Sequence, residues 1–426
     1  MTLVTLLVWA LPALTESWGS GSAGQPELEK ITVERAVAEA IEKNFALMAQ
    51  RQNIAVAEAR IITARLRPNP VLTVEGDHLD LLGTRYSDVN RAGPAEFSAR
   101  TDVVLERGGK RNYRIEAAEA AREVARLQFL DSVRSLVLDV QTAFADATLA
   151  GSNLALAREN LKALNEIVEV NQARVRSGDL AEVELLRTRV AALGFQNAVR
   201  QGELRLRAAL NRLKLLLGRS RDARGIEVAG DLRRDPGPVS RSDVERDALA
   251  RRPDVLALRQ DQARSAAELR LQLAQGKVDY VVGTEYRRQQ GLAGTGNSLG
   301  LFFSTPLPLF NRNQGEIERA RQEHQQIELR LRGLEATIRS DVDTAYEQYS
   351  TAKGLLETIE RDMLQQSQDV RQIMEYSYRR GEATLVEFLD AQRAFNETTQ
   401  AYNEARAEYA RSLYLIDSIA GKSVAR

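Results

Sequence analysis

The sequence RSGDLAEVELL at residues 176–186 returns about 200 residues later as RRGEATLVEFL at residues 379–389. In both copies a glycine, Gly178 or Gly381, lies between an arginine-containing segment and an acidic residue, and apolar residues at helical spacing follow. A glycine in this setting is typical of the end of one helix and the approach to the next. Each copy therefore predicts the turn of an antiparallel helical hairpin.

Apolar residues recur every seven positions on both sides of each predicted turn. Around Gly178 the seam consists of Val133, Val140, Ala147, Leu154, Leu161, Val168 and Val175, then Leu185, Ala192, Val199, Leu206 and Leu213. Around Gly381 it consists of Val342, Tyr349, Leu356, Met363 and Val370, then Phe388, Phe395, Tyr402, Tyr409 and Ile416. Sustained heptads predict long helices packed as in coiled coils. A helix from residue 110 to 176 would be about 100 Å long.

A second shared motif supports a tandem duplication, because DVQTAF at residues 139–144 returns as DVDTAY at residues 341–346. We expect a first repeat over residues 24–232 and a second over 241–426. Residues 233–240, which include Pro236 and Pro238, are the predicted linker between them.

Each repeat is expected to start with a shorter helix, over residues 32–67 or 240–275, and to continue with two strands. The first strand pair is predicted over residues 71–106 and the second over 278–305, the latter around a glycine-rich loop at 291–296. In the second pair one face carries Val278, Tyr280, Val282 and Tyr286, and the other carries Asp279, Gly283, Glu285 and Arg287. This alternation suits barrel strands with lipid outside and water inside; a soluble hairpin on a helical core is the alternative.

The N-terminus carries a short apolar run from Leu3 to Leu14, followed by small residues up to Ala23. A transmembrane helix needs about 20 apolar residues, so the run is too short to span a bilayer. We expect residues 1–23 to be a signal peptide, although no Lys or Arg precedes the run. A buried N-terminal helix is the alternative.

The composition excludes several classes of function. The chain contains 59 Lys+Arg and 59 Asp+Glu, and no concentrated basic stretch, which argues against nucleic acid as a partner. It has no cysteine and only two histidines, His78 and His324, so we expect no metal site and no cofactor. No nucleophile with a base and no phosphate loop is present, and we therefore predict no catalytic residues and no enzyme.

Four strands per chain cannot close a barrel, and open strand edges are unfavourable in lipid. Several chains must therefore contribute to one barrel. The predicted fold class is mainly α with a small β part: long helical hairpins in tandem form an α-barrel, and four strands join a transmembrane β-barrel. A long, oligomeric, water-filled duct is the object that these elements imply.

The whole layout from residue 24 onward resembles the TolC-type outer-membrane efflux family. The motif PLPLFNRNQG at residues 306–315 is similar to that of its heavy-metal (Czc/Cus-type) branch. The resemblance implies a homotrimer in the outer membrane with a 12-stranded barrel and a periplasmic helical extension. It also implies two partners, a periplasmic adaptor (membrane fusion) protein and an inner-membrane resistance-nodulation-division pump.

The same resemblance implies passive export of heavy-metal cations. A drug-efflux or type I secretion duct of the same fold remains an alternative, as does an exported structural coiled-coil protein. The motif at 306–315 also has a local structural reading. Pro306 and Pro308 would end a strand, Asn311 and Asn313 would cap the next helix, and Gly315 would allow close backbone approach.

The resemblance places function at two sets of residues. The tips expected to contact the adaptor contain Arg176, Ser177, Gly178, Asp179, Arg379, Arg380, Gly381 and Glu382. The expected periplasmic gate contains Tyr378, Glu387 and Asp390. Three copies of the acidic pair would surround a narrow opening and attract cations. Some relatives have a basic residue where this chain has Ala383, so the salt bridge that closes their gate lacks its cation here. Solvated charges at a turn and ordinary exposed acids are the alternatives.

Overall fold

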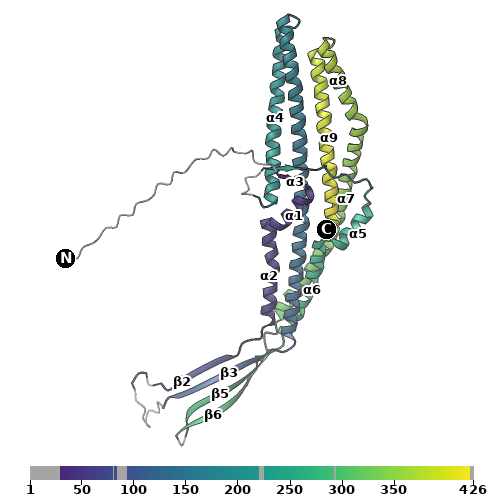
Figure 1. Ribbon diagram of the computed structural model, residues 1–426. Coiled ribbons are helices and arrows are strands. Elements are labelled where there is room, and N and C mark those ends of the chain that lie inside the picture. The colour runs from purple at the N-terminus through teal and green to yellow at the C-terminus, as the bar shows by residue number, and fades with distance from the viewer. Residues whose placement is uncertain (1–28, 80, 84–93, 220–224, 292–293, 423–426) are drawn as a thin grey trace, which may run out of the picture.

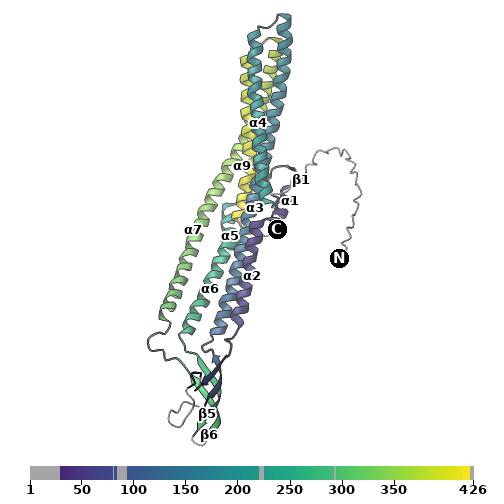
Figure 2. The ribbon, with the colours of Figure 1, turned by 90° about the vertical axis from the view of Figure 1, so that its left-hand side faces the viewer.

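The computed structural model describes residues 29–79, 81–83, 94–219, 225–291 and 294–422. The predicted signal peptide at residues 1–23 lies outside these residues. The molecule is elongated, with strands at one end and the turns of two helical hairpins at the other (Figure 1). Short strands and helices lie beside the long helices at mid-height (Figure 2). We call this region the mid-height band.

The first hairpin consists of α3 (Lys110–Ser177), a single helix of 68 residues, and α4 (Glu182–Leu216). The second consists of α7 (Gln314–Thr358), a π-helical turn η1 (Ile359–Met363), α8 (Leu364–Arg380) and α9 (Leu385–Ile419). No proline lies between Pro94 and Pro236 or after Pro308, which is why these helices run unbroken by proline.

Two helices in each repeat replace the single shorter helix that we predicted, which corrects both expectations. The first repeat has α1 (Val33–Lys43) and α2 (Phe45–Arg65), and the second has α5 (Arg241–Arg251) and α6 (Pro253–Gln275). At the first break Asn44 is extended, and its side chain accepts a hydrogen bond from the N–H of Leu47 at 3.0 Å. At the second break Pro253 disfavours helical backbone at Arg252 before it.

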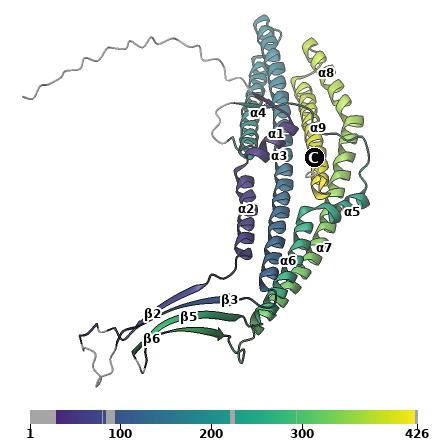
Figure 3. The ribbon, with the colours of Figure 1, turned by 60° about the horizontal axis from the view of Figure 1, so that its bottom comes forward.

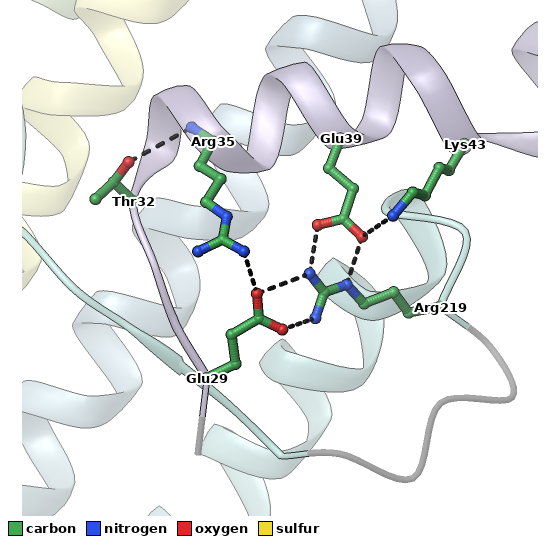
Figure 4. A network of polar contacts seen from close by, with 6 residues as sticks. All are labelled: Glu29, Thr32, Arg35, Glu39, Lys43 and Arg219. Carbon is green, nitrogen blue, oxygen red and sulfur yellow. Dashed lines mark hydrogen bonds and ion pairs between the residues drawn. The ribbon is translucent and has the colours of Figure 1, made fainter. Parts of the chain in front are cut away.

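A parallel pair of short strands, β1 (Glu29–Ile31) and β4 (Ile226–Val228), joins the start of the first repeat to its end. Our sequence interpretation missed both, because three residues are too few for a periodic signal. Arg219, just after α4, donates hydrogen bonds to Glu29 at 2.6 Å and to Glu39 at 2.5 Å (Figure 4). The pKa of Glu39 is lowered chiefly by this hydrogen bond. The band is thus held by a largely buried ionic cluster as well as by strand pairing.

The four longer strands form one antiparallel sheet in the order β2-β3-β5-β6. They are β2 (Val71–Asp77), β3 (Glu96–Leu105), β5 (Tyr280–Gly291) and β6 (Gly294–Ser304). The two pairs meet between β3 and β5, so the repeats share a sheet (Figure 3). The predicted loop at 291–296 is wrong, since β5 and β6 continue until Gly291 pairs with Gly294. β2 and β6 are the two edges.

Paired residues on one face of this sheet are mostly apolar and exposed. The register places Leu105 opposite Tyr280 and Val282 opposite Phe303. The same face carries Leu72, Val74, Phe97, Tyr286, Leu299 and Leu301. Leu301 is 82% exposed. The opposite face carries polar and charged side chains, among them Glu285, which accepts a hydrogen bond from Arg287 at 2.7 Å. The sheet therefore has one side suited to lipid and one suited to water.

The heptad seam is buried where the two hairpins pass the mid-height band. Val140, Ala147 and Leu154 of α3 are buried, as are Val342, Tyr349 and Leu356 of α7. From the last residue of the π turn onward the predicted seam is wrong, because Met363 and Val370 are exposed. In α8 the inward positions are instead those one residue later: Leu364, Arg371 and Tyr378. A π turn inserts one extra residue into the helix, and this shifts every following side chain to a different face.

The motif at 306–315 follows β6 and leads into α7. Asn313 precedes α7 in a left-handed conformation, but its side chain donates to the carbonyl of Gln272 at 2.8 Å and makes no cap bond. Nothing in the described part of the chain lies within 4 Å of a Cβ built at Gly315. The expected capping by Asn313 and close approach at Gly315 are therefore both wrong, and Asn313 instead ties the loop to α6.

Candidate channel entrance at the helical tips

The two tips are built in the same way. Gly178 and Gly381 have φ of 81° and 82°, and each ends its helix by donating its N–H to a carbonyl three residues earlier. The following residues, Asp179 and Glu382, donate their N–H groups to carbonyls of the same last turn at 2.8 and 2.9 Å. A left-handed residue is needed for this closure, and glycine adopts that conformation without strain.

The tip side chains differ more than their backbones do. Arg176 is exposed, and Ser177 donates to the Asp179 carboxylate at 2.7 Å. At the second tip Arg379 pairs with Glu375 at 2.8 Å, and the guanidinium of Arg380 lies over the ring of Tyr376, 4.5 Å from its centre. The first tip thus offers an exposed cation, while at the second Arg380 is held against its own helix and Arg379 also pairs with Glu166 of α3 at 3.5 Å.

Tyr378 is buried inside the protomer, with 4% of its surface exposed. Its ring stacks on Phe388 with centroids 5.4 Å apart, and its hydroxyl accepts a hydrogen bond from Asn171 at 2.7 Å. Asn171 also donates to the hydroxyl of Thr188 at 2.8 Å. This layer joins α3, α4, α8 and α9 close to the tips.

Sequence reasoning did not assign a role to Asn171 or Thr188. The signal was present, since Asn171 follows Leu164 by seven residues in a seam that is otherwise apolar. A polar residue at a seam position fixes which partners face each other. The carbonyl oxygen of the Asn171 side chain is buried without a hydrogen-bond partner in the described part of the chain.

Glu387 and Asp390 lie three residues apart near the start of α9, and both are exposed. Glu387 forms a capping box: it accepts hydrogen bonds from the N–H and the hydroxyl of Thr384, at 2.7 and 2.8 Å. These bonds lower the pKa of Glu387. Asp390 lies 3.5 Å from Arg393, and its side chain is 63% exposed. Glu387 is therefore charged at neutral pH.

The structure brings only part of the expected gate together within one protomer. Glu387 and Asp390 share an exposed face of α9, whereas Tyr378 points into the helical core. The one-residue shift after η1 explains the difference, because it places Tyr378 on the inward seam of α8. Tyr378 supports the start of α9 through Phe388 and does not line the same surface as the acids.

The described residues form neither a metal site nor a membrane-spanning helix. In the described ranges, no three His, Asp or Glu residues are grouped so that they could hold a metal ion. His324 instead shares a hydrogen bond of 2.7 Å with Ser265. No helix among the described residues is both long enough and apolar enough to cross a membrane.

Comparison with known proteins gives consistent matches along the chain. The family model described as outer membrane efflux protein matches residues 36–219 and 244–422. The cobalt-zinc-cadmium resistance protein CzcC of Cupriavidus metallidurans is 23% identical over 398 residues, which are 92% of this chain and 90% of that protein. The pyoverdine export outer membrane protein OpmQ of Pseudomonas putida is 27% identical over 419 residues, and the match covers 90% of this chain and 83% of that protein.

Solved structures show the same fold. A crystal structure of CusC superposes with a TM-score of 0.75 at 18% identity and covers 91% of this chain and 92% of that one. VceC from Vibrio cholerae gives a TM-score of 0.70 at 16% identity, and the match covers 91% of this chain and 96% of that one. The family match spans most of the chain, and its members are channels and not enzymes. This protein therefore belongs to the outer membrane efflux protein family and is a channel of the outer membrane with a long periplasmic helical part.

Proposed function

We propose that this protein is the exit duct of a tripartite efflux system that exports heavy-metal cations. The observation that carries the proposal is the sheet with one apolar and one polar face and two unpaired edges, continuous with two long helical hairpins. Three copies would close the edges into a 12-stranded barrel. A homotrimer, a periplasmic adaptor and an inner-membrane resistance-nodulation-division pump complete the proposed assembly.

The metal substrate is supported by two relatives with metal resistance in their names. These are CzcC and the nickel-cobalt-cadmium resistance protein NccC, the latter 24% identical over 304 residues. Pyoverdine export is a second candidate, because OpmQ has higher identity at 27%. The two are separable by complementation. In a strain lacking its own duct, this chain should restore growth on cadmium or cobalt; restoration of siderophore export alone would favour the second candidate.

We assign the gate to Glu387 and Asp390, supported indirectly by Tyr378. Three exposed copies of the acidic pair would place six carboxylates around one opening, and a ring of like charge favours cations. The tip set around Gly178 and Gly381 is proposed to contact the adaptor. There, exposed Arg176 is the cation best placed to bind a carboxylate or a backbone carbonyl.

Ion selectivity in a planar bilayer tests the gate. Glu387→Gln with Asp390→Asn should lower the ratio of cation to anion permeability of the reconstituted channel. Glu227→Gln with Asp231→Asn removes the same charge from the mid-height band, where both side chains are exposed, and should leave the ratio unchanged. If the two double variants behave alike, the acids of α9 do not line the opening.

A further inference from the structure

The apolar face of the sheet ends at an aromatic pair where the strands meet the helices. The rings of Tyr280 and Phe303 lie side by side, with centroids 5.2 Å apart. Arg107 follows β3 by two residues, lies over the Tyr280 ring at 4.3 Å from its centre and donates a hydrogen bond to the Tyr280 hydroxyl. An amphipathic ring with a cation at its polar end is typical of the depth where hydrocarbon gives way to headgroups.

Three further cations are exposed at this junction. Lys277 lies against Gly108, beside Arg107, and the backbone of Arg312 packs so closely on Gly276 that a side chain there would clash. Arg67 lies four residues before the start of β2 and is also exposed. We call Arg67, Arg107, Lys277 and Arg312 the junction collar.

The side chains of the junction collar have no carboxylate partner within the described part of the chain. Neighbouring acids are already paired: Glu106 with Arg114 at 2.7 Å, and Asp279 with Lys110 at 2.8 Å. The collar therefore carries positive charge that the protomer does not neutralise. Unmatched cations inside a duct for metal ions would oppose their passage, whereas at the outer surface they match the phosphates of lipid headgroups.

The loop between β6 and α7 lies at the base of α7 (Figure 2). It adds exposed apolar side chains to the junction. Leu307, Leu309 and Phe310 are 76%, 67% and 90% exposed. The loop is nevertheless ordered by its own hydrogen bonds, since Arg312 donates to the carbonyl of Pro308 at 3.1 Å and Gln314 donates to that of Phe310 at 3.0 Å. A loop that satisfies its backbone and turns its apolar side chains outward suits insertion among acyl chains.

We infer that the junction collar and the side chains of Leu307, Leu309 and Phe310 bind anionic phospholipids of the periplasm-facing leaflet of the outer membrane. The collar pairs with headgroup phosphates, and the loop inserts beside the first acyl carbons. The occupant is lipid and not a second copy of the chain, because the surface continues directly from the apolar face of the sheet and carries unmatched cations. The inference rests on the proposed channel, whose sheet spans the membrane.

The first test measures lipid preference of the full chain in bilayers, with spin-labelled phosphatidylglycerol compared with spin-labelled phosphatidylcholine. Each cation near a membrane surface contributes about fivefold to the affinity for anionic lipid. We expect a preference of about fivefold or more, falling to within about twofold of parity when all four collar residues are replaced by glutamine. The matched control replaces three exposed arginines and one exposed lysine far from the sheet, Lys162, Arg189, Arg200 and Arg205.

The second test measures depth with one tryptophan. Trp9 and Trp18 are the only tryptophans of the sequence and both lie in the predicted signal peptide, so the mature chain provides a background without this fluorophore. In that background Phe310→Trp should be quenched strongly by phospholipid brominated near the headgroup. Tyr376→Trp, at a position 55% exposed near the tip, should not be quenched.

The outcomes separate the lipid site from the channel itself. A collar variant that conducts like the parent but loses its lipid preference supports the inference. A parent without preference, a control variant that loses it equally, or an unquenched Phe310→Trp would overturn the inference and leave the loop to a neighbouring copy or to water. Conductance measured on the same preparations tests the channel separately, because its absence would contradict the proposed function whatever lipid is bound.

Discussion

The two helical hairpins have the same turn but differ along their first helices. α3 is one α-helix of 68 residues, whereas the corresponding part of the second repeat is divided by the five-residue π turn η1. π turns often mark functional sites in otherwise regular helices. The first hairpin is thus a continuous rod, and the second has a defined position at which it is expected to bend.

The ion pairs that hold the two hairpins at mid-height also differ. Near the end of the first hairpin, Arg219 is 10% exposed and binds both Glu29 and Glu39. At the π turn Glu360 pairs with Arg234 of the segment between the repeats, through two bonds of 2.9 Å, but the Arg234 side chain is 61% exposed. At the π turn the second hairpin is thus held by a pair that solvent reaches, whereas the first hairpin ends in a buried cluster. Arg233 ties the other helix of the second hairpin, α9, through Asp417 at 2.6 Å. We therefore expect the second hairpin to carry the movement that opens the entrance.

The largest effect should come from the cluster that holds the two hairpins together near their tips. Phe388 is 1% exposed and contributes to a core with Leu164 and Ile167 of α3. Phe388→Ala leaves a cavity, and we expect a loss of about 3–5 kcal/mol in the local stability of α8 and α9, measured by hydrogen exchange. Phe388→Leu should cost clearly less. If hydrogen exchange accelerates equally at the tip end of α4, the two hairpins do not move separately.

The next largest effect should come from the buried ionic cluster of the first hairpin. Arg219→Met leaves the 9% exposed Glu39 without its main partner, and we expect the contact between α1 and the end of α4 to lose about 3 kcal/mol. Arg35→Met removes a more exposed partner of Glu29 and should cost less than about 1 kcal/mol. Hydrogen exchange in α1 distinguishes the two, and similar losses would mean that burial does not determine the effect.

Much of the architecture could be predicted from the sequence because the responsible signals are periodic and long. The heptads around Gly178 and Gly381 indicated the hairpins, and the alternation around Val282 indicated strands with two unlike faces. Shorter features had no such signal. The breaks at Asn44 and Arg252 depend on single residues, and the pairing of β1 with β4 depends on contacts between residues nearly 200 positions apart.

The gate was harder to predict because one local event changes everything after it. A heptad continued from Leu356 places Met363 and Val370 inward, and Tyr378 falls beside the seam. The π turn moves the seam by one residue, so Tyr378 is buried and Met363 is exposed. No composition rule predicts a π turn at Ile359. The acids of α9 were unaffected, because that helix begins anew at Leu385 with its own N-cap, Thr384.

A smaller effect is expected at the exposed pair of Arg234 with Glu360, which contacts the second hairpin at its π turn. Arg234→Met removes the pair with Glu360, and an exposed pair contributes less than about 1 kcal/mol. Hydrogen exchange should accelerate in η1 while α3 stays unchanged. Lys353→Met removes a weaker exposed contact with Glu357, at 4.0 Å, and provides the control. If hydrogen exchange at η1 responds to neither variant, the pair of Arg234 with Glu360 does not restrain the π turn.

The smallest effect should be a response of the second tip to acid. Hydrogen bonds from Thr384 lower the pKa of Glu387 below its ordinary 4.5, so the cap contributes its full stability above that pH and loses it as pH falls through the lowered pKa. The N-cap of α4 is Ala181, whose side chain makes no cap bond. Between pH 7 and pH values below about 4, the first turn of α9 should therefore fray more than that of α4.

Glu387→Gln separates this charge effect from other consequences of acid. The amide side chain keeps an acceptor for the Thr384 N–H but does not titrate in this range. Hydrogen exchange corrected for the intrinsic pH dependence of each amide should show acid fraying of α9 in the parent and not in the variant. The same fraying in both would assign the response to other groups, and the two tips would then differ in cap geometry alone.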